Sequence, residues 1–140
     1  MARVVPTIVL ADDHEQVRRT VVAVLQDEFQ IVGIAENGVQ LIELALSAHP
    51  DVIVLDIFMP FIGGIETAIR VKAFGCTSKV LFLTVDEDPD LAEMAMAIGA
   101  LGYVLKARLA TDLIPAIRNA LDGRVYISRS MHLSLPSVSS

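Results

Sequence analysis

The stretch that decides the fold is residues 51–60, which read DVIVLDIFMP. The four apolar residues at 52–55 form a short run rich in β-branched side chains, which predicts a strand buried on both faces. A carboxylate, Asp56, follows this strand directly, and Pro60 lies in the loop after it. In an open parallel sheet ligands bind at the carboxyl ends of the strands, so Asp56 is the first candidate functional residue.

Short apolar runs of the same kind recur along the chain and alternate with longer amphipathic stretches. The runs predict strands over residues 7–11, 31–35, 52–55, 80–83 and 102–105. Apolar positions at helical spacing predict helices over about 14–27, 39–48, 64–74, 89–98 and 111–121. Strands that alternate with helices imply right-handed crossovers. The sequence therefore predicts an α/β fold, a single doubly wound (βα)5 domain with a five-stranded parallel sheet.

Two helix boundaries can be predicted from single residues. Asp88 is expected to cap the helix that begins at Pro89, because proline is well tolerated at the first helical position. Pro115 would cost a hydrogen bond inside a helix. We therefore expect it in the first turn of the last helix, counted from Thr111 or Asp112.

Composition limits the class of protein. The chain has 140 residues, enough for one domain, and 54% of them are hydrophobic. Its formal charge of −6 argues against a free-standing binder of the nucleic-acid backbone. Charges interrupt each apolar stretch before the ~18 residues of a membrane span, and no signal-peptide pattern is present, so we expect a cytoplasmic location and no membrane contact. The single cysteine, Cys76, excludes an internal disulfide.

The last residues of the chain differ in composition from the rest. They are rich in serine and include Pro136. We therefore divide the chain into a folded domain at 1–127 and a flexible tail or truncated linker at 128–140.

Polar side chains follow four of the five predicted strands. They are Asp12 and Asp13, Asp56, Thr84 and Lys106. Because parallel strands end at the same edge of a sheet, these side chains are expected to converge. Taken singly, each has an ordinary structural explanation; Asp12 or Asp13, for example, could simply cap the first helix.

The converging groups suggest a specific chemistry. Carboxylates held close together share protons or recruit a cation, and a small set of oxygen ligands suits Mg²⁺. A phosphoryl group would have its charge neutralised by the metal and by Lys106, so Asp56 could attack phosphorus and form an acyl phosphate. Thr84 could donate to a phosphoryl oxygen. For His14, beside the acidic pair, a metal or phosphate role and a place in the first turn of the helix both stay open.

Four motifs together resemble the receiver domain of two-component response regulators. They are Leu10-Ala11-Asp12-Asp13-His14, Val54-Leu55-Asp56-Ile57-Phe58-Met59-Pro60, Leu83-Thr84 and Gly102-Tyr103-Val104-Leu105-Lys106. The resemblance covers about residues 7–122 and implies the flavodoxin-like strand order 2-1-3-4-5. The segment GRVYIS at 123–128 is similar to the end of receivers that precede a LuxR-like helix-turn-helix domain, although too few residues follow here to form one.

The resemblance also implies roles for individual residues. Asp56 would be the phosphoacceptor, with Lys106 paired to the phosphoryl group. Thr84 and Tyr103 would move when the phosphoryl group arrives. The Mg²⁺ ligands would be Asp12 (largely through water), Asp13, Asp56 and the main-chain carbonyl of Phe58.

A function follows from the resemblance. The chain would accept a phosphoryl group on its own aspartate from a sensor histidine kinase and change its signalling surface, with no turnover on an external substrate. Control of transcription would pass through a DNA-binding output domain absent from this chain, and a homodimer is compatible with the family. The alternative is a receiver-like module that acts through protein contacts without phosphorylation.

The loop after Asp56 departs from the family pattern. Gly63 stands where receivers usually carry an aspartate, which should weaken the cap of the third helix. Phe58 replaces a residue that is often polar; we expect it to slow spontaneous dephosphorylation, unless its ring simply packs against a neighbour. Phe61 and Ile62 either form an exposed apolar patch or fold onto the third helix.

Two other functions fit the residues less well. A haloacid-dehalogenase-type phosphatase would need a second aspartate two residues after the nucleophile, where Phe58 cannot transfer a proton. A flavin-binding module would need a small, hydroxyl-rich phosphate loop after the first strand. The two aspartates there would repel phosphate.

Overall fold

The computed structural model describes residues 4–128 and forms one parallel sheet covered by helices on both faces. The strands are β1 (Thr7–Ala11), β2 (Gln30–Ala35), β3 (Val52–Leu55), β4 (Lys79–Thr84), β5 (Gly102–Leu105) and β6 (Tyr126–Ile127). The helices are α1 (Glu15–Leu25), α2 (Gly38–Ala48), α3 (Gly64–Ala73), α4 (Pro89–Ala97) and α5 (Leu109–Leu121), with a short 3₁₀ turn, Lys106–Arg108, before α5.

The order of the strands in the sheet is β2-β1-β3-β4-β5-β6, and all neighbours pair in parallel. The predicted α/β class and the order 2-1-3-4-5 are therefore confirmed. The sixth strand, which the sequence analysis does not predict, adds two residues beside β5.

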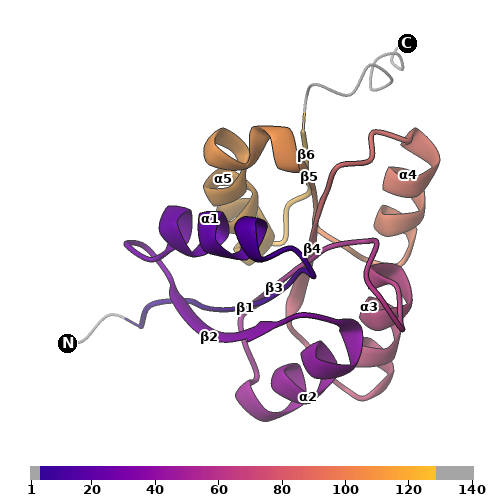
Figure 1. Cartoon of the computed structure of the whole chain (residues 1–140), viewed down its shortest axis with the longest axis horizontal. Coiled ribbons are helices and arrows are strands. Elements are labelled where there is room, and N and C mark those ends of the chain that lie inside the picture. Colours follow the sequence, from indigo (N-terminus) through magenta and orange to yellow (C-terminus); the bar gives the residue numbers. More distant parts are fainter. Residues whose placement is uncertain (1–3, 129–140) are drawn as a thin grey trace.

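Alternate residues of each central strand feed two separate cores, as period-two side-chain alternation requires. On one face, Ile8 and Leu10 of β1 pack with α1 and α5 residues such as Val21 and Leu113. On the other face, Val9 and Ala11 pack with residues of α2, α3 and α4. Figure 1 shows α1 and α5 together on one side of the sheet and α2 to α4 around the other. This burial of both faces explains the continuous apolar runs of the central strands.

Two predicted helix ends can be compared with the structure. The Asp88 side chain accepts a hydrogen bond from Asp90 N, and Pro89 is the first residue of α4, as predicted. The prediction for Pro115 is wrong. The 3₁₀ turn after β5 leads directly into α5 at Leu109, which places Pro115 in the second turn of the helix. The carbonyl of Thr111 then lacks its usual helical partner, because proline has no N–H.

The folded region extends at least one residue further than the sequence suggests. Ser128, assigned above to the tail, is fully buried, and its N–H donates to the carbonyl of Tyr103. Residues 129–140 of the predicted tail lie outside the described residues. Among residues 4–128, no helix is long and apolar enough to cross a membrane.

Candidate metal centre

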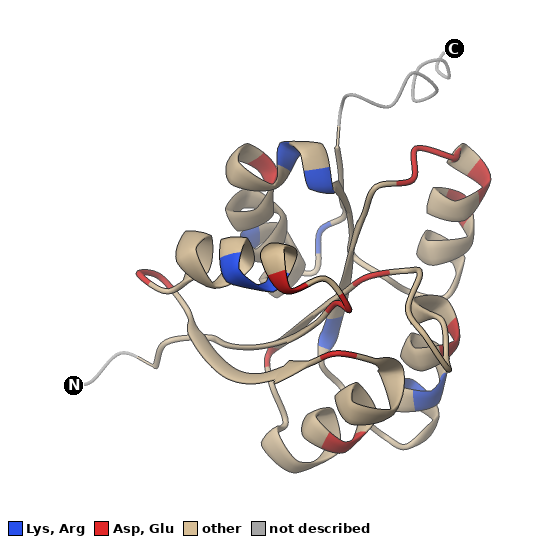
Figure 2. Ribbon diagram, viewed as in Figure 1, with Lys and Arg blue, Asp and Glu red and all other residues tan. Residues whose placement is uncertain are grey.

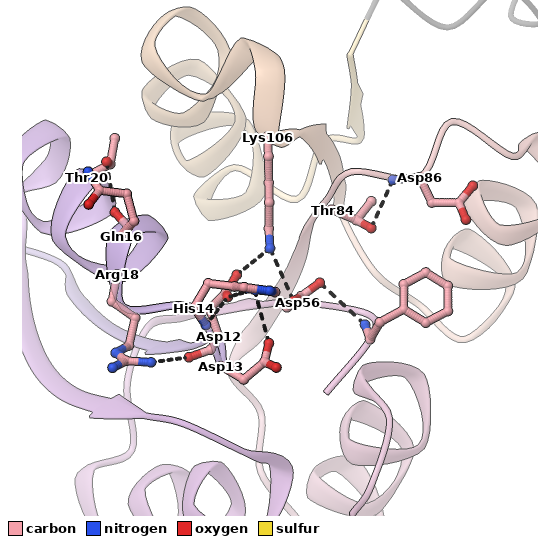
Figure 3. A network of polar contacts seen from close by, with 11 residues as sticks. Asp12, Asp13, His14, Gln16, Arg18, Thr20, Asp56, Thr84, Asp86 and Lys106 are labelled. Carbon is pink, nitrogen blue, oxygen red and sulfur yellow. Dashed lines mark hydrogen bonds and ion pairs between the residues drawn. The ribbon is translucent and has the colours of Figure 1, made fainter. Parts of the chain in front are cut away.

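The polar residues predicted from the strand ends lie at one edge of the sheet (Figure 3). Asp12 and Asp13 follow β1, Asp56 follows β3 and Lys106 follows β5, while Thr84 is the last residue of β4. Figure 2 shows that acidic residues follow β1 and β3 and continue into the loop before α4. The structure thus brings residues up to 94 positions apart in the chain to one place because parallel strands share this edge.

Lys106 is the cation of the site. Its Nζ lies 2.7 Å from Oδ2 of Asp12 and 3.1 Å from Oδ2 of Asp56. All three side chains are largely buried. Burial alone would lower the pKa of Lys106, but its contacts with Asp12 and Asp56 outweigh this and raise it. Lys106 is therefore firmly protonated and offsets the charge of two carboxylates.

Asp56 is buried, and its environment makes ionisation unfavourable. Loss of water and repulsion from Asp12 raise its pKa; attraction and hydrogen bonding from Lys106 and the N–H of Phe58 only partly offset this. The Phe58 N–H donates to Oδ1 at 3.3 Å, and Lys106 donates to Oδ2. Lys106 therefore does not fully offset the negative charge of Asp12 and Asp56, as expected for a site that recruits a cation.

Asp12 is held by the start of α1. Its Oδ1 accepts a hydrogen bond from the backbone N–H of His14 at 2.9 Å, and Arg18 donates to its main-chain carbonyl at 2.8 Å. The helix-capping explanation considered for Asp12 or Asp13 is wrong, because His14 is the N-cap residue of α1 and no side chain caps the helix. The turn that Asp12 forms with His14 instead fixes the direction of its carboxylate.

The donor set fits a divalent cation. Ligand atoms of Asp12, Asp13, His14 and Asp56 all lie within 4.8 Å of one another. Oδ2 of Asp12 is buried and has no partner with hydrogen-bond geometry, although Lys106 lies close to it. A buried oxygen without a well-formed hydrogen bond is costly, and a cation would satisfy it. The site has three carboxylates, and it is open to solvent at Asp13. This arrangement suits Mg²⁺, because Mg²⁺ keeps several water ligands.

Thr84 and Tyr103 both contact the loop that leads into α4. The Thr84 hydroxyl accepts a hydrogen bond from the N–H of Asp86 at 3.2 Å, and the Tyr103 hydroxyl donates to the carbonyl of Asp86 at 2.7 Å. Tyr103 is fully buried, and burial followed by repulsion from Asp86 and Asp88 raises its pKa, so it stays protonated. The tyrosine ring thus already points inward in this structure.

The loop after Asp56 is shaped by glycine. A Cβ on Gly64 would lie 2.0 Å from the main-chain oxygen of Asp56, so only glycine allows this close approach. Gly63 is the N-cap of α3 and provides no side-chain hydrogen bond, as its sequence predicts. Phe58 is 53% exposed and Phe61 84% exposed, whereas Ile62 is half-buried. Of the two residues proposed for an apolar patch, only Phe61 is fully presented to solvent.

One buried polar group behind the site could not be found from sequence. Asp112 of α5 accepts hydrogen bonds from Arg108, Thr111 and Ser128. The Ser128 hydroxyl in turn accepts from the N–H of Leu105, the residue before Lys106. An aspartate among helical residues looks solvent-exposed in a linear sequence, and only the position of Asp112 on the buried face of α5 indicates otherwise.

The chain matches one family model and is similar in sequence to several curated proteins. The family model described as the response regulator receiver domain matches residues 8–118. The response regulator GacA of Pseudomonas aeruginosa is 34% identical over 123 residues, covering 86% of this chain and 58% of the relative. The nitrate/nitrite response regulator protein NarL of Escherichia coli is 34% identical over 127 residues, covering 89% and 59%. The chain thus spans less than two thirds of the length of these curated relatives.

A solved structure shows the same architecture. A two-component response regulator of the LuxR family from Aurantimonas sp. superposes with a TM-score of 0.86 at 28% sequence identity. The match covers 91% of this chain and 93% of that one. The similarity therefore extends over nearly the whole described region.

Proposed function

The chain belongs to the response regulator receiver family, and from this membership we propose that it is a phosphoacceptor switch of a two-component system. The observation that carries the proposal is the contact of Lys106 with both Asp12 and Asp56 at the carboxyl edge of the sheet. An ammonium held between two buried carboxylates is placed to stabilise the negative charge of a phosphoryl group on Asp56.

Phosphorylation would take place on Asp56. A carboxylate oxygen of Asp56 attacks phosphorus, a P–O bond forms, and the bond to the donor breaks with its electron pair on the leaving group. The leaving group is a histidine nitrogen of the sensor kinase, or acetate when acetyl phosphate is the donor. Lys106 stabilises the charge on the phosphoryl oxygens. Mg²⁺, held by Asp12, Asp13, Asp56 and the main-chain carbonyl of Phe58, would supply further positive charge when bound.

The conformational response would pass through the loop before α4. In the present structure the Thr84 hydroxyl is occupied by the N–H of Asp86. A phosphoryl group on Asp56 offers an acceptor for the Thr84 O–H, and movement of the side chain toward it would break the hydrogen bond that Thr84 accepts from Asp86. Tyr103 holds the same residue through its carbonyl. We propose that these two contacts together transmit phosphorylation to α4 and β5.

The partners follow from the same proposal. A sensor histidine kinase is the donor, the protein acts in the cytoplasm, and a homodimer is a further expected form. Transcription would be controlled through a DNA-binding output domain outside this sequence. The domain has no expected turnover on an external substrate.

Incubation with acetyl phosphate and Mg²⁺, followed by intact-mass spectrometry, tests the proposal. We expect a phosphoryl increment in the wild type, and none in Asp56→Asn or after removal of Mg²⁺ with a chelator. A chain that stays unlabelled while a known receiver is labelled would contradict the proposal and favour action through protein contacts alone. An increment that persists in Asp56→Asn would place the phosphoryl group on another residue.

Phe58 is expected to lengthen the lifetime of the phosphorylated form. Phe58 lies two residues after Asp56, and its ring offers no hydrogen bond to an attacking water. Phe58→Asn would supply one, worth about 1 kcal/mol, and speed hydrolysis by about fivefold. The decay of the phosphoryl increment over time measures the rate. Phe61→Asn, in the same exposed loop, is the control; equal lifetimes for Phe58→Asn and the wild type would disprove the idea.

A further inference from the structure

His14 lies within the carboxylate cluster and has no part in the chemistry proposed above. Its Nδ1 is 3.1 Å from Oδ1 of Asp12 and 3.2 Å from Oδ1 of Asp13. Figure 3 shows the His14 ring beside the carboxylates of Asp12 and Asp13. The imidazole nitrogen therefore occupies the same small space as the oxygens expected to hold the metal.

The spacing of these atoms suits one coordination sphere. Neighbouring ligands of an octahedral ion with bonds of about 2.1 Å lie about 3.0 Å apart, and opposite ligands about 4.2 Å apart. The two distances from His14 to Asp12 and Asp13 agree with neighbouring ligands. All four ligand atoms, including the one from Asp56, lie within 4.8 Å, so small side-chain movements would place them around one ion.

The start of α1 fixes His14 in this position. Its backbone N–H donates to Asp12 Oδ1, and its φ and ψ of −100° and 116° are extended rather than helical. The side chain is 63% exposed. A neutral ring can therefore turn Nδ1 to an ion and keep Nε2–H in water at little cost. Apart from its ion pair with Lys106, the buried Oδ2 of Asp12 has no hydrogen-bond partner, which independently supports a cation at this site.

We infer that His14 is a nitrogen ligand of the divalent cation, which makes the site more favourable to first-row transition ions relative to Mg²⁺ than an all-oxygen site. The inference rests on the proposed function, since it adds a ligand to the same metal centre. Imidazole nitrogen suits transition metals, whereas Mg²⁺ prefers oxygen. Loss of the imidazole should therefore lower the affinity for Mn²⁺ more than that for Mg²⁺.

Electron spin echo measurements on the full chain with bound Mn²⁺ test this directly, with no need for phosphorylation. We expect ¹⁴N modulation from a coordinated imidazole in the wild type and its loss in His14→Gln. The control is His49→Asn, because His49 ends α2 at the opposite edge of the sheet and should leave the signal unchanged. Competition between Mn²⁺ and Mg²⁺ should show the affinity ratio falling by about tenfold in His14→Gln.

The outcomes separate the inference from the proposed function. Bound Mn²⁺ without ¹⁴N modulation, or modulation that persists in His14→Gln, would overturn the role of His14 and leave the metal centre standing. Failure of the wild type to bind Mn²⁺ or Mg²⁺ at all would overturn both.

Discussion

A chain with alanine in place of Asp112 is expected to lose about 3 kcal/mol of stability, because it leaves a buried hydroxyl and a guanidinium without their partner. Asp112 is 2% exposed and accepts hydrogen bonds from Arg108 at 2.9 Å and from Ser128 at 2.8 Å. Arg108 is partly exposed, so most of the loss comes from the fully buried Ser128. Urea unfolding followed by circular dichroism measures the change.

The effect should depend on pH in a definite direction. Burial would raise the pKa of Asp112, but the hydrogen bonds from Arg108, Ser128 and Thr111 outweigh it and lower the pKa. A carboxyl whose pKa is lower in the folded state stabilises the fold above its unfolded value, near 3.8, and loses that contribution as pH falls through the folded value. The difference between wild type and Asp112→Ala should therefore be full at neutral pH and shrink below about pH 4.

Asp122 provides the control for Asp112. It lies at the end of the same helix, but its side chain is exposed. Asp122→Ala should change stability by less than about 0.5 kcal/mol. Equal losses for the two variants would mean that the contacts of Asp112 with Arg108 and Ser128 do not stabilise the fold.

Asparagine at position 56 is expected to stabilise the metal-free protein, whereas methionine at position 106 should destabilise it. In the wild type one ammonium faces two buried carboxylates. Asp56→Asn removes the repulsion with Asp12 and leaves a one-to-one pair, for a gain of about 1 kcal/mol. Lys106→Met leaves both carboxylates without a cation, for a loss of about 3 kcal/mol. Thermal or urea unfolding in the presence of a chelator measures both changes.

The sign of the pH dependence distinguishes this effect from a change in packing. The pKa of Asp56 is raised in the folded state, so its ionisation destabilises the fold as pH rises above the unfolded value of 3.8. The advantage of Asp56→Asn should thus be absent below pH 3.8, grow as the pH rises, and become full above the folded-state pKa of Asp56. Mg²⁺ should reverse the order, because it binds and stabilises the wild type more than the variant. An advantage of Asp56→Asn that is the same at all pH values would contradict the electrostatic explanation.

Much of the fold was predictable because its signals are local. Apolar runs bounded by turn residues gave strands β1, β3 and β5 with the observed bounds, and the positions of all five helices to within about two residues. The last helix was misjudged at Pro115. A 3₁₀ turn that begins at Lys106 moves the start of α5 toward the N-terminus, and this depends on how β5 meets the helix rather than on the residues of α5.

The β6 strand and Ser128 show a different reason for failure. The serine-rich composition after residue 127 is typical of a tail. The Ser128 hydroxyl nevertheless lies in the core because Asp112 and the N–H of Leu105, 16 and 23 residues away in sequence, offer it two hydrogen bonds. A buried polar residue is favoured only when such partners exist, and they become visible only after the chain has folded.

Local sequence patterns were enough to predict that carboxylates, a hydroxyl and an ammonium follow the strands of a parallel sheet, since side-chain periodicity and strand length depend on neighbouring residues. The way these groups interact becomes visible only in the folded chain, where Lys106 contacts both Asp12 and Asp56 and His14 joins the acidic pair. The raised pKa of Asp56 is likewise a property of the folded chain. The physical reason is that electrostatic energies depend on distance and on the exclusion of water, and both are set by packing between segments far apart in the chain.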